Sequence, residues 1–84
     1  MKPIFLELRH LKTLLALKET GSVSLAAKRV YLTQSALSHQ IKLLEDQYGL
    51  PLFERKTQPL HFTPAGERLI QLANDILPKV IEAE

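Results

Sequence analysis

The fold of this chain is decided by residues 22–48, which read SVSLAAKRVYLTQSALSHQIKLLEDQY. Ser24 and Thr33 each precede a run with helical periodicity, and each side chain can accept a backbone N–H bond at the start of a helix. We therefore expect a short helix over residues 25–31 and a longer helix over residues 34–48. Only a brief turn separates the two, and this arrangement is typical of a helix-turn-helix.

The longer expected helix has two different faces, because each residue turns the helix by about 100°. Its apolar stripe should enter the core and consists of Leu37, Ile41, Leu44 and Tyr48. Its second face gathers side chains that donate hydrogen bonds: Gln34, Ser35, Ser38, His39 and Lys42. Glu45 and Asp46 close this face, and Gly49 should end the helix. A strip of donors suits phosphates and base edges, but an ordinary solvated face has the same pattern, so both interpretations stay open.

Two further patterns flank this unit. A leucine-rich run over residues 7–18 has helical spacing and stops at Gly21, which suits a left-handed C-terminal position. Residues 52–55 and 60–63 alternate as short strands do, and together they predict a small hairpin. A hairpin behind a helix-turn-helix is the winged variety of that fold, and the tip of this wing is basic, with Arg55 and Lys56.

A last helix should begin with Thr63 as its N-cap and Pro64 at its first position. Pro78 should kink or end it. The helix carries two apolar stripes, of which one consists of Leu69, Ala73, Ile76 and Val80 and the other of Ile70, Leu77 and Ile81. One stripe can pack on the domain and the other on a second copy, whereas a helix folded back entirely on its own domain is the alternative.

The formal net charge of +2 conceals an asymmetry along the chain. Residues 1–44 carry a balance of +5, residues 45–84 carry −3, and no acid lies between Glu19 and Glu45. Acid-free windows that contain bases are candidate contact surfaces for a polyanion such as a nucleic acid.

Length and composition exclude several classes of protein. The 84 residues correspond to one domain, and 45% hydrophobic residues with a low net charge exclude a disordered chain. The absence of Cys excludes a disulfide scaffold, a thiolate metal site and a Cys nucleophile. No apolar run is long enough to span a membrane, and Glu7 comes too early for a secretory segment. We therefore expect a cytoplasmic protein without a membrane partner.

Five blocks of the sequence resemble the N-terminal part of the LysR-type transcriptional regulators. The blocks are LRHLKTL (8–14), GSVSLAA (21–27), TQSALSHQIKLLE (33–45), YGLPLFER (48–55) and FTPAGE (62–67), in the order and spacing of that family. The runs KTQPLHFTP (56–64) and QLAN (71–74) are similar to the branch of the family that regulates methionine biosynthesis.

The resemblance implies a mainly α fold, in which a winged helix-turn-helix of three helices and a two-stranded wing precedes a long dimerisation linker helix. The domain boundaries would be 1–62 for the DNA-binding domain and 63–84 for the linker helix. Family members continue into an effector-binding domain, which this chain lacks, and a small-molecule co-inducer is expected only for that domain.

The resemblance also implies a function: sequence-specific binding of double-stranded DNA, as a homodimer on two-fold related sites, to regulate transcription in a bacterial cytoplasm. Helix 34–48 would enter the major groove, and wing 52–62 would contact the backbone or the minor groove. The implied DNA contacts are Thr33, Gln34, Ser35, Ser38, His39 and Lys42, with Arg55 and Lys56 on the wing. The implied dimer contacts are Leu69, Ile70, Ala73, Ile76, Leu77, Val80 and Ile81. Ser35 and His39 stand where many members carry Pro and Arg.

Three other functions compete with this hypothesis. An enzyme would need a catalytic constellation, but His10, His39 and His61 stand far apart and no metal-ligand cluster or phosphate loop is evident, so we expect no catalysis, no metal and no cofactor. A winged-helix protein-interaction module would need exposed apolar anchors on the third helix. The LysR-like DNA-binding domain of the molybdate-responsive regulator shares the fold but differs in the last helix.

Overall fold

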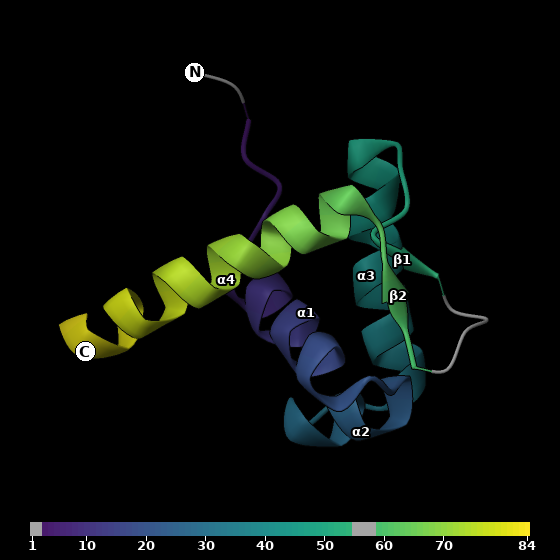
Figure 1. Ribbon diagram of the computed structural model, residues 1–84, viewed down its shortest axis with the longest axis horizontal. Helices are drawn as coiled ribbons and strands as arrows, with labels where there is room; N and C mark the ends of the chain where they lie inside the picture. Colours follow the sequence, from purple (N-terminus) through teal and green to yellow (C-terminus); the bar gives the residue numbers. More distant parts are fainter. Residues whose placement is uncertain (1–2, 55–58) are drawn as a thin grey trace.

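The computed structural model describes residues 3–54 and 59–84. The elements follow in the order α1 (Leu8–Thr20), α2 (Val23–Arg29), α3 (Gln34–Tyr48), β1 (Phe53–Glu54), β2 (His61–Phe62) and α4 (Pro64–Ala83). In Figure 1 the first three helices form the body of the domain, while α4 crosses α1 and continues beyond that body to the C-terminus. The prediction of a mainly helical fold with a two-stranded wing is confirmed.

Helix α2 begins and ends two residues earlier than the sequence predicts. Its N-cap is Ser22, whose hydroxyl oxygen accepts the Leu25 N–H at 3.2 Å, so Ser24 lies inside the helix. The expectation that Ser24 caps this helix is therefore wrong, because the chain turns directly after Gly21. At the other end, Tyr31 has a left-handed φ of 59° and leaves the helix.

Helix α3 begins and ends as predicted. The Thr33 hydroxyl oxygen accepts the Ala36 N–H at 3.0 Å, and Gly49 has the left-handed φ of 73° that a C-cap needs. Helix α4 also starts as predicted, with the Thr63 hydroxyl oxygen accepting the Gly66 N–H at 3.1 Å.

The helix does not end at Pro78 but continues through it to Ala83. Proline removes one backbone N–H, which leaves the carbonyl of Asn74 without its helical donor. Both residues are exposed, so water can reach that carbonyl.

The core lies where α1, α2, α3 and the residues around the hairpin meet. The buried side chains include Leu14, Leu17, Ala26, Ala27, Leu37, Ile41, Leu44, Leu52 and Phe53. The stripe of α3 is thus confirmed for its first three residues. Tyr48 is instead 37% exposed, because it borders an open groove of about 250 Å³ between the end of α3 and the start of α4.

Glu45 belongs to the core rather than to the donor face of α3. Its side chain is buried, and its carboxylate accepts the Leu52 N–H at 2.7 Å. The expectation that Glu45 closes the exposed face is therefore wrong, since the carboxylate holds the chain at the entry to β1. Asp46, the next residue, is exposed.

The wing is an antiparallel hairpin in which Phe53 pairs with Phe62 and Glu54 pairs with His61. The two phenylalanine rings lie 5.9 Å apart between centroids, and Phe53 is buried while His61 is exposed. The strands are therefore attached to the core by their aromatic side. Arg55 and Lys56, the expected wing contacts, lie outside the described residues.

Gly66 lets the start of α4 lie directly against the backbone before β1. A Cβ on Gly66 would lie 2.0 Å from the Leu52 carbonyl oxygen. That oxygen cannot easily move, since it accepts the Thr63 N–H at 3.0 Å. The same contact therefore joins the wing to α4.

We expect Gly66→Ala to lower the free energy of unfolding by about 3 kcal/mol, because the added methyl group collides with a hydrogen-bonded carbonyl. Gly49→Ala is the matched control: its Cβ would meet open space, and only the left-handed φ costs about 1 kcal/mol. Urea unfolding of both variants measures the difference. Equal losses would contradict the close approach of Gly66 to Leu52.

Candidate nucleic-acid interface

The predicted donor residues share the exposed face of α3. Thr33, Gln34, Ser35, His39 and Lys42 are exposed, and Ser38 is half-buried. Burial of the opposite stripe against the core produces this exposure, because it leaves the donor face as the outer side of the helix. The structure therefore brings together the residues that the sequence pattern placed on one face.

One cation of this face already has an acidic neighbour. Lys42 Nζ lies 3.3 Å from Asp46 Oδ1, one helical turn further along, and both side chains are largely exposed. Such a pair contributes less than about 1 kcal/mol in water. A phosphate group can therefore displace Asp46 from Lys42 at little cost.

Two other bases of residues 1–44 are neutralised by acids that lie elsewhere in the sequence. Arg29 forms an ion pair with Glu19, and Lys18 Nζ lies 2.7 Å from the Glu67 carboxylate on α4. The balance of +5 already counts Glu19, so only the pair of Lys18 with Glu67 lowers the positive charge of residues 1–44 below that value. Neither pair could be predicted from the sequence, because the partners lie far apart in it.

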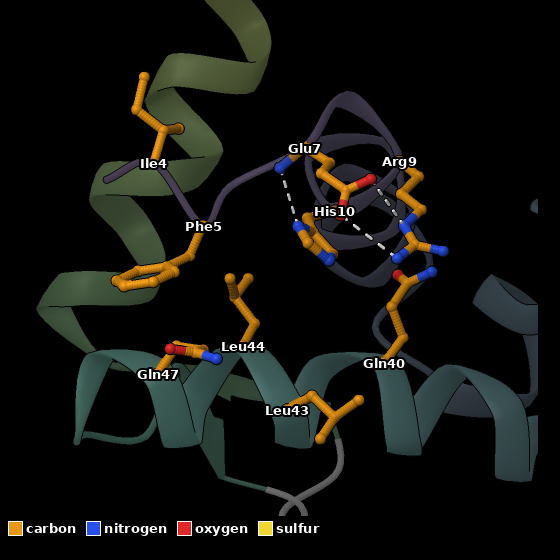
Figure 2. A pocket seen from close by; sticks show the side chains of 9 residues that line it. All are labelled: Ile4, Phe5, Glu7, Arg9, His10, Gln40, Leu43, Leu44 and Gln47. Carbon is orange, nitrogen blue, oxygen red and sulfur yellow. Dashed lines mark hydrogen bonds and ion pairs between the residues drawn. The ribbon is translucent and has the colours of Figure 1, made fainter. Parts of the chain in front are cut away.

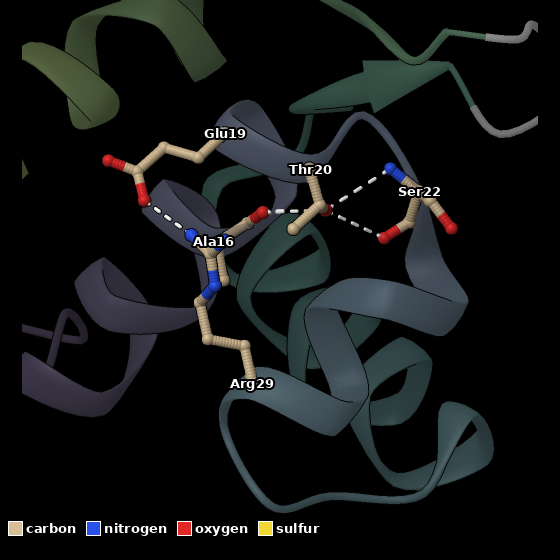
Figure 3. A network of polar contacts seen from close by, with 5 residues as sticks. All are labelled: Ala16, Glu19, Thr20, Ser22 and Arg29. Atoms are coloured by element: carbon tan, nitrogen blue, oxygen red, sulfur yellow. Dashed lines mark hydrogen bonds and ion pairs between the residues drawn. The ribbon is translucent and has the colours of Figure 1, made fainter.

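A polar network at the turn between α1 and α2 sets the position of the helix-turn-helix (Figure 3). The Thr20 hydroxyl donates to the Ala16 carbonyl at 2.7 Å and accepts the Ser22 N–H at 3.3 Å. The ion pair of Arg29 with Glu19, at 2.5 Å, ties the end of α2 to α1. These residues orient α2, and through the following turn α3, but no sequence motif marked them.

The residues expected in a dimer interface do not share one face of α4. Ile70 and Ala73 are buried within the chain, where they complete the core against α1. The expectation that these two residues contact a partner is therefore wrong. Leu69, Ile76, Leu77 and Val80 are half-buried, and Ile81 is 71% exposed. Leu72, which lies beside the first stripe, is 38% exposed.

A cavity of about 350 Å³ lies behind α3, between that helix, α1 and the N-terminal arm. Figure 2 shows Phe5, His10 and Gln40 around it. His10 Nδ1 accepts the Glu7 N–H at 2.9 Å and so caps α1. Burial lowers the pKa of His10, an effect that the Glu7 carboxylate opposes and the Arg9 guanidinium reinforces. His10 is therefore an uncharged structural residue and no part of the donor face.

The described part of the chain contains no group of three metal-ligating side chains that could hold an ion. None of its helices has the length and hydropathy needed to cross a membrane.

A family model described as the bacterial regulatory helix-turn-helix protein, lysR family, matches residues 8–67. The chain is 83% identical over 84 residues to the HTH-type transcriptional regulator MetR of Haemophilus influenzae, covering all of this chain and 27% of that protein. It is 55% identical over 78 residues to MetR of Escherichia coli K12, covering 93% of this chain and 25% of that protein. The chain thus spans about a quarter of the length of these curated relatives.

Solved structures show the same arrangement of elements. The complex of the BenM DNA-binding domain with benA site 1 DNA has a TM-score of 0.84 and 37% identity, covering 93% of this chain and 88% of that one. DarR of Vibrio fischeri in complex with DNA has a TM-score of 0.83 and 31% identity, covering 95% of this chain and 27% of that one.

The lowered pKa of His10 predicts a loss of stability in acid. The unfolded chain protonates this imidazole near pH 6.5, whereas the folded chain resists protonation, so the free energy of unfolding should fall as the pH drops below 6.5. His10→Gln is the matched variant, since glutamine at this position can still accept the Glu7 N–H without titrating. Urea unfolding between pH 7 and 5 should show a steeper loss for the wild type. If the free energy of unfolding falls equally with pH in both proteins, the lowered pKa of His10 is contradicted.

Proposed function

Because this chain belongs to the LysR family of bacterial regulatory helix-turn-helix proteins, we propose that it binds duplex DNA sequence-specifically as a homodimer. Helix α3 enters the major groove, and the wing lies on the backbone or in the minor groove. The observation that carries this proposal is the exposed donor face of α3, held outward by a buried stripe on the same helix. The complexes of BenM and DarR with DNA support it.

The donor face divides into two roles. The Gln34 side-chain amide, in the first turn of α3, can donate to and accept from adenine in a bidentate contact. Thr33, Ser35, Ser38 and His39 contact bases or phosphates around it. Lys42, further along the same face, binds a phosphate as a point charge.

The wing adds a second DNA contact, through Arg55 and Lys56, which lie outside the residues that the structure describes. Arg55 and Lys56 follow directly after β1, and their charges suit the DNA backbone or the minor groove. The support for this role is the family resemblance together with the short hairpin that carries them.

The chain acts as the DNA-binding part of a longer transcriptional regulator. The length of its relatives supports this, as does the similarity of the last two sequence runs to regulators of methionine biosynthesis. We place its regulated genes in methionine or sulfur metabolism and its site of action in the bacterial cytoplasm, at the nucleoid. An effector-binding domain beyond residues 63–84 would hold a co-inducer, and the chain itself performs no catalysis.

Helix α4 supplies the dimer contact through its half-exposed edge. Leu69, Leu72, Ile76 and Val80 follow one another at steps of three and four residues and define this edge. The solvent-facing side of α4 beyond this edge carries Arg68 near one end and Glu82 near the other, fourteen residues apart and within about 40° of each other around the helix.

An antiparallel pair of α4 helices satisfies both the apolar edge and the flanking charges. If the two-fold axis passes between Leu72 and Ile76, Leu69 of one copy faces Val80 of the other. Arg68 then lies beside Glu82 of the partner. A parallel pair would place like charges opposite each other, which is unfavourable. The flanking charges therefore favour the antiparallel pair. This pairing relates the two copies by a two-fold axis, so that their two recognition helices can bind a two-fold related site.

We expect binding to a duplex selected from a random pool to weaken with salt, with a log–log slope of about −0.9 for each neutralised phosphate. Lys42→Ala should weaken all duplexes alike and make the slope shallower by about one unit per copy. Gln34→Ala should relax the preference for the selected duplex by about 1–3 kcal/mol. Fluorescence anisotropy across a salt series measures both quantities.

Gln47→Ala is the matched control for Gln34, since it removes an exposed glutamine from the opposite side of α3. It should bind as the wild type does. A wild-type slope near zero would reject duplex binding, and equal losses on every sequence for Gln34→Ala would reject Gln34 as a base reader.

The antiparallel pairing predicts a charge-reversal effect. Arg68→Glu or Glu82→Arg alone should weaken the dimer by about 3- to 10-fold, because each replaces two attractive pairs by repulsions, and the double variant should restore it. Asn74→Glu, on the opposite side of α4, is the control and should leave the dimer unchanged. Sedimentation equilibrium gives the dissociation constants. A double variant as weak as either single variant would contradict this register.

A further inference from the structure

The turn between α2 and α3 contains a tyrosine in a conformation that tyrosine disfavours. Tyr31 has a φ of 59°, and the other described residues with positive φ are Gly21 and Gly49. A left-handed backbone costs a residue with a Cβ about 1–2 kcal/mol, which glycine avoids. The side chain gains nothing in exchange, because it is 94% exposed.

The backbone explains the left-handed conformation but not the tyrosine. The Tyr31 N–H donates to the Lys28 carbonyl at 3.3 Å, and the Leu32 N–H donates to the Ala27 carbonyl at 2.9 Å. These two bonds close the end of α2, and they require a left-handed residue between them. Gly or Asn would meet that requirement at lower cost. A strained, solvent-exposed aromatic residue points to a role outside the fold.

We propose that the Tyr31 hydroxyl donates a hydrogen bond to a phosphate of the DNA backbone at the edge of the groove that α3 enters. This inference rests on the proposed function and extends its contact surface from α3 into the preceding turn. Tyr31 precedes the N-cap of α3 by two residues and Gln34 by three, so its Cα lies within about 11 Å of the Cα of the base reader. The major groove is about 12 Å wide, which places this turn beside the sugar–phosphate wall.

The charge around the turn favours a phosphate as the acceptor. Lys28 is exposed and forms no ion pair among residues 3–54 and 59–84, whereas its neighbour Arg29 is held by Glu19. No acid stands between Glu19 and Glu45 in the sequence. Lys28 therefore supplies a positive charge to the same backbone segment, while Tyr31 supplies a neutral, directional donor.

Tyr31→Phe tests the proposal, since it removes one hydroxyl group and keeps the ring and the backbone. We expect the Kd for the selected duplex to rise about tenfold, as the loss of a hydrogen bond to a charged group predicts. Unrelated duplexes should weaken by the same factor, and the salt slope should not change because the donor is neutral. Tyr48→Phe, at the far end of α3, is the matched control and should bind as the wild type does.

Tyr31→Asn separates function from folding. Asparagine tolerates the left-handed conformation, so its urea midpoint should rise above that of the wild type. A lower midpoint would show that Tyr31 supports the fold, and it would overturn the proposal.

The outcomes distinguish this inference from the function on which it rests. If the wild type binds duplexes with no salt dependence, the proposed function fails. If the wild type and Lys42→Ala behave as predicted but Tyr31→Phe binds as the wild type does, only the role of Tyr31 fails, and a surface for a protein partner becomes the alternative. A change in sequence preference, in place of a uniform loss, would reject the phosphate as the acceptor.

Discussion

Burial of the apolar stripe of α3 is the constraint on which the rest of this structure depends. Leu37, Ile41 and Leu44 pack into the core with residues of α1 and α2, and this packing fixes which side of α3 remains in water. The donor face is exposed because the stripe is buried. Two devices hold the helix in that position: the Thr33 cap at its start and the buried Glu45 carboxylate, which accepts the Leu52 N–H near its end.

Most of the polar contacts around the candidate nucleic-acid interface orient the helices relative to one another. The Thr20 network and the pair of Arg29 with Glu19 connect α2 to α1, and Lys18 connects α1 to Glu67 on α4. Exposed ion pairs contribute little to stability individually. Here the ion pairs also neutralise Lys18 and Arg29. The positive surface that remains for DNA therefore includes fewer residues than the number of Lys and Arg in the sequence indicates.

The differences between expectation and structure share one cause. Ser22 and Ser24 are both suitable N-caps, and only the position of the preceding turn selects Ser22. Glu45 reads as a surface residue of an amphipathic helix, yet a buried N–H of the chain seven residues later gives it a partner. Ile70 and Ala73 were expected at a partner surface, but α1 covers them. In each case the deciding contact comes from outside the local pattern.

The winged helix-turn-helix, the bounds of α3, the cap of α4 and the common face of the proposed base and phosphate contacts were all predictable from local sequence patterns. These features follow from caps, glycine positions and helical periodicity, which act within one or two turns of chain. Three other properties emerge from packing: the apolar edge of α4 that stays open, the bases that are neutralised, and the strained, exposed conformation of Tyr31 before α3. Those properties depend on neighbours far away in sequence, because burial and ion pairing are set by the whole fold.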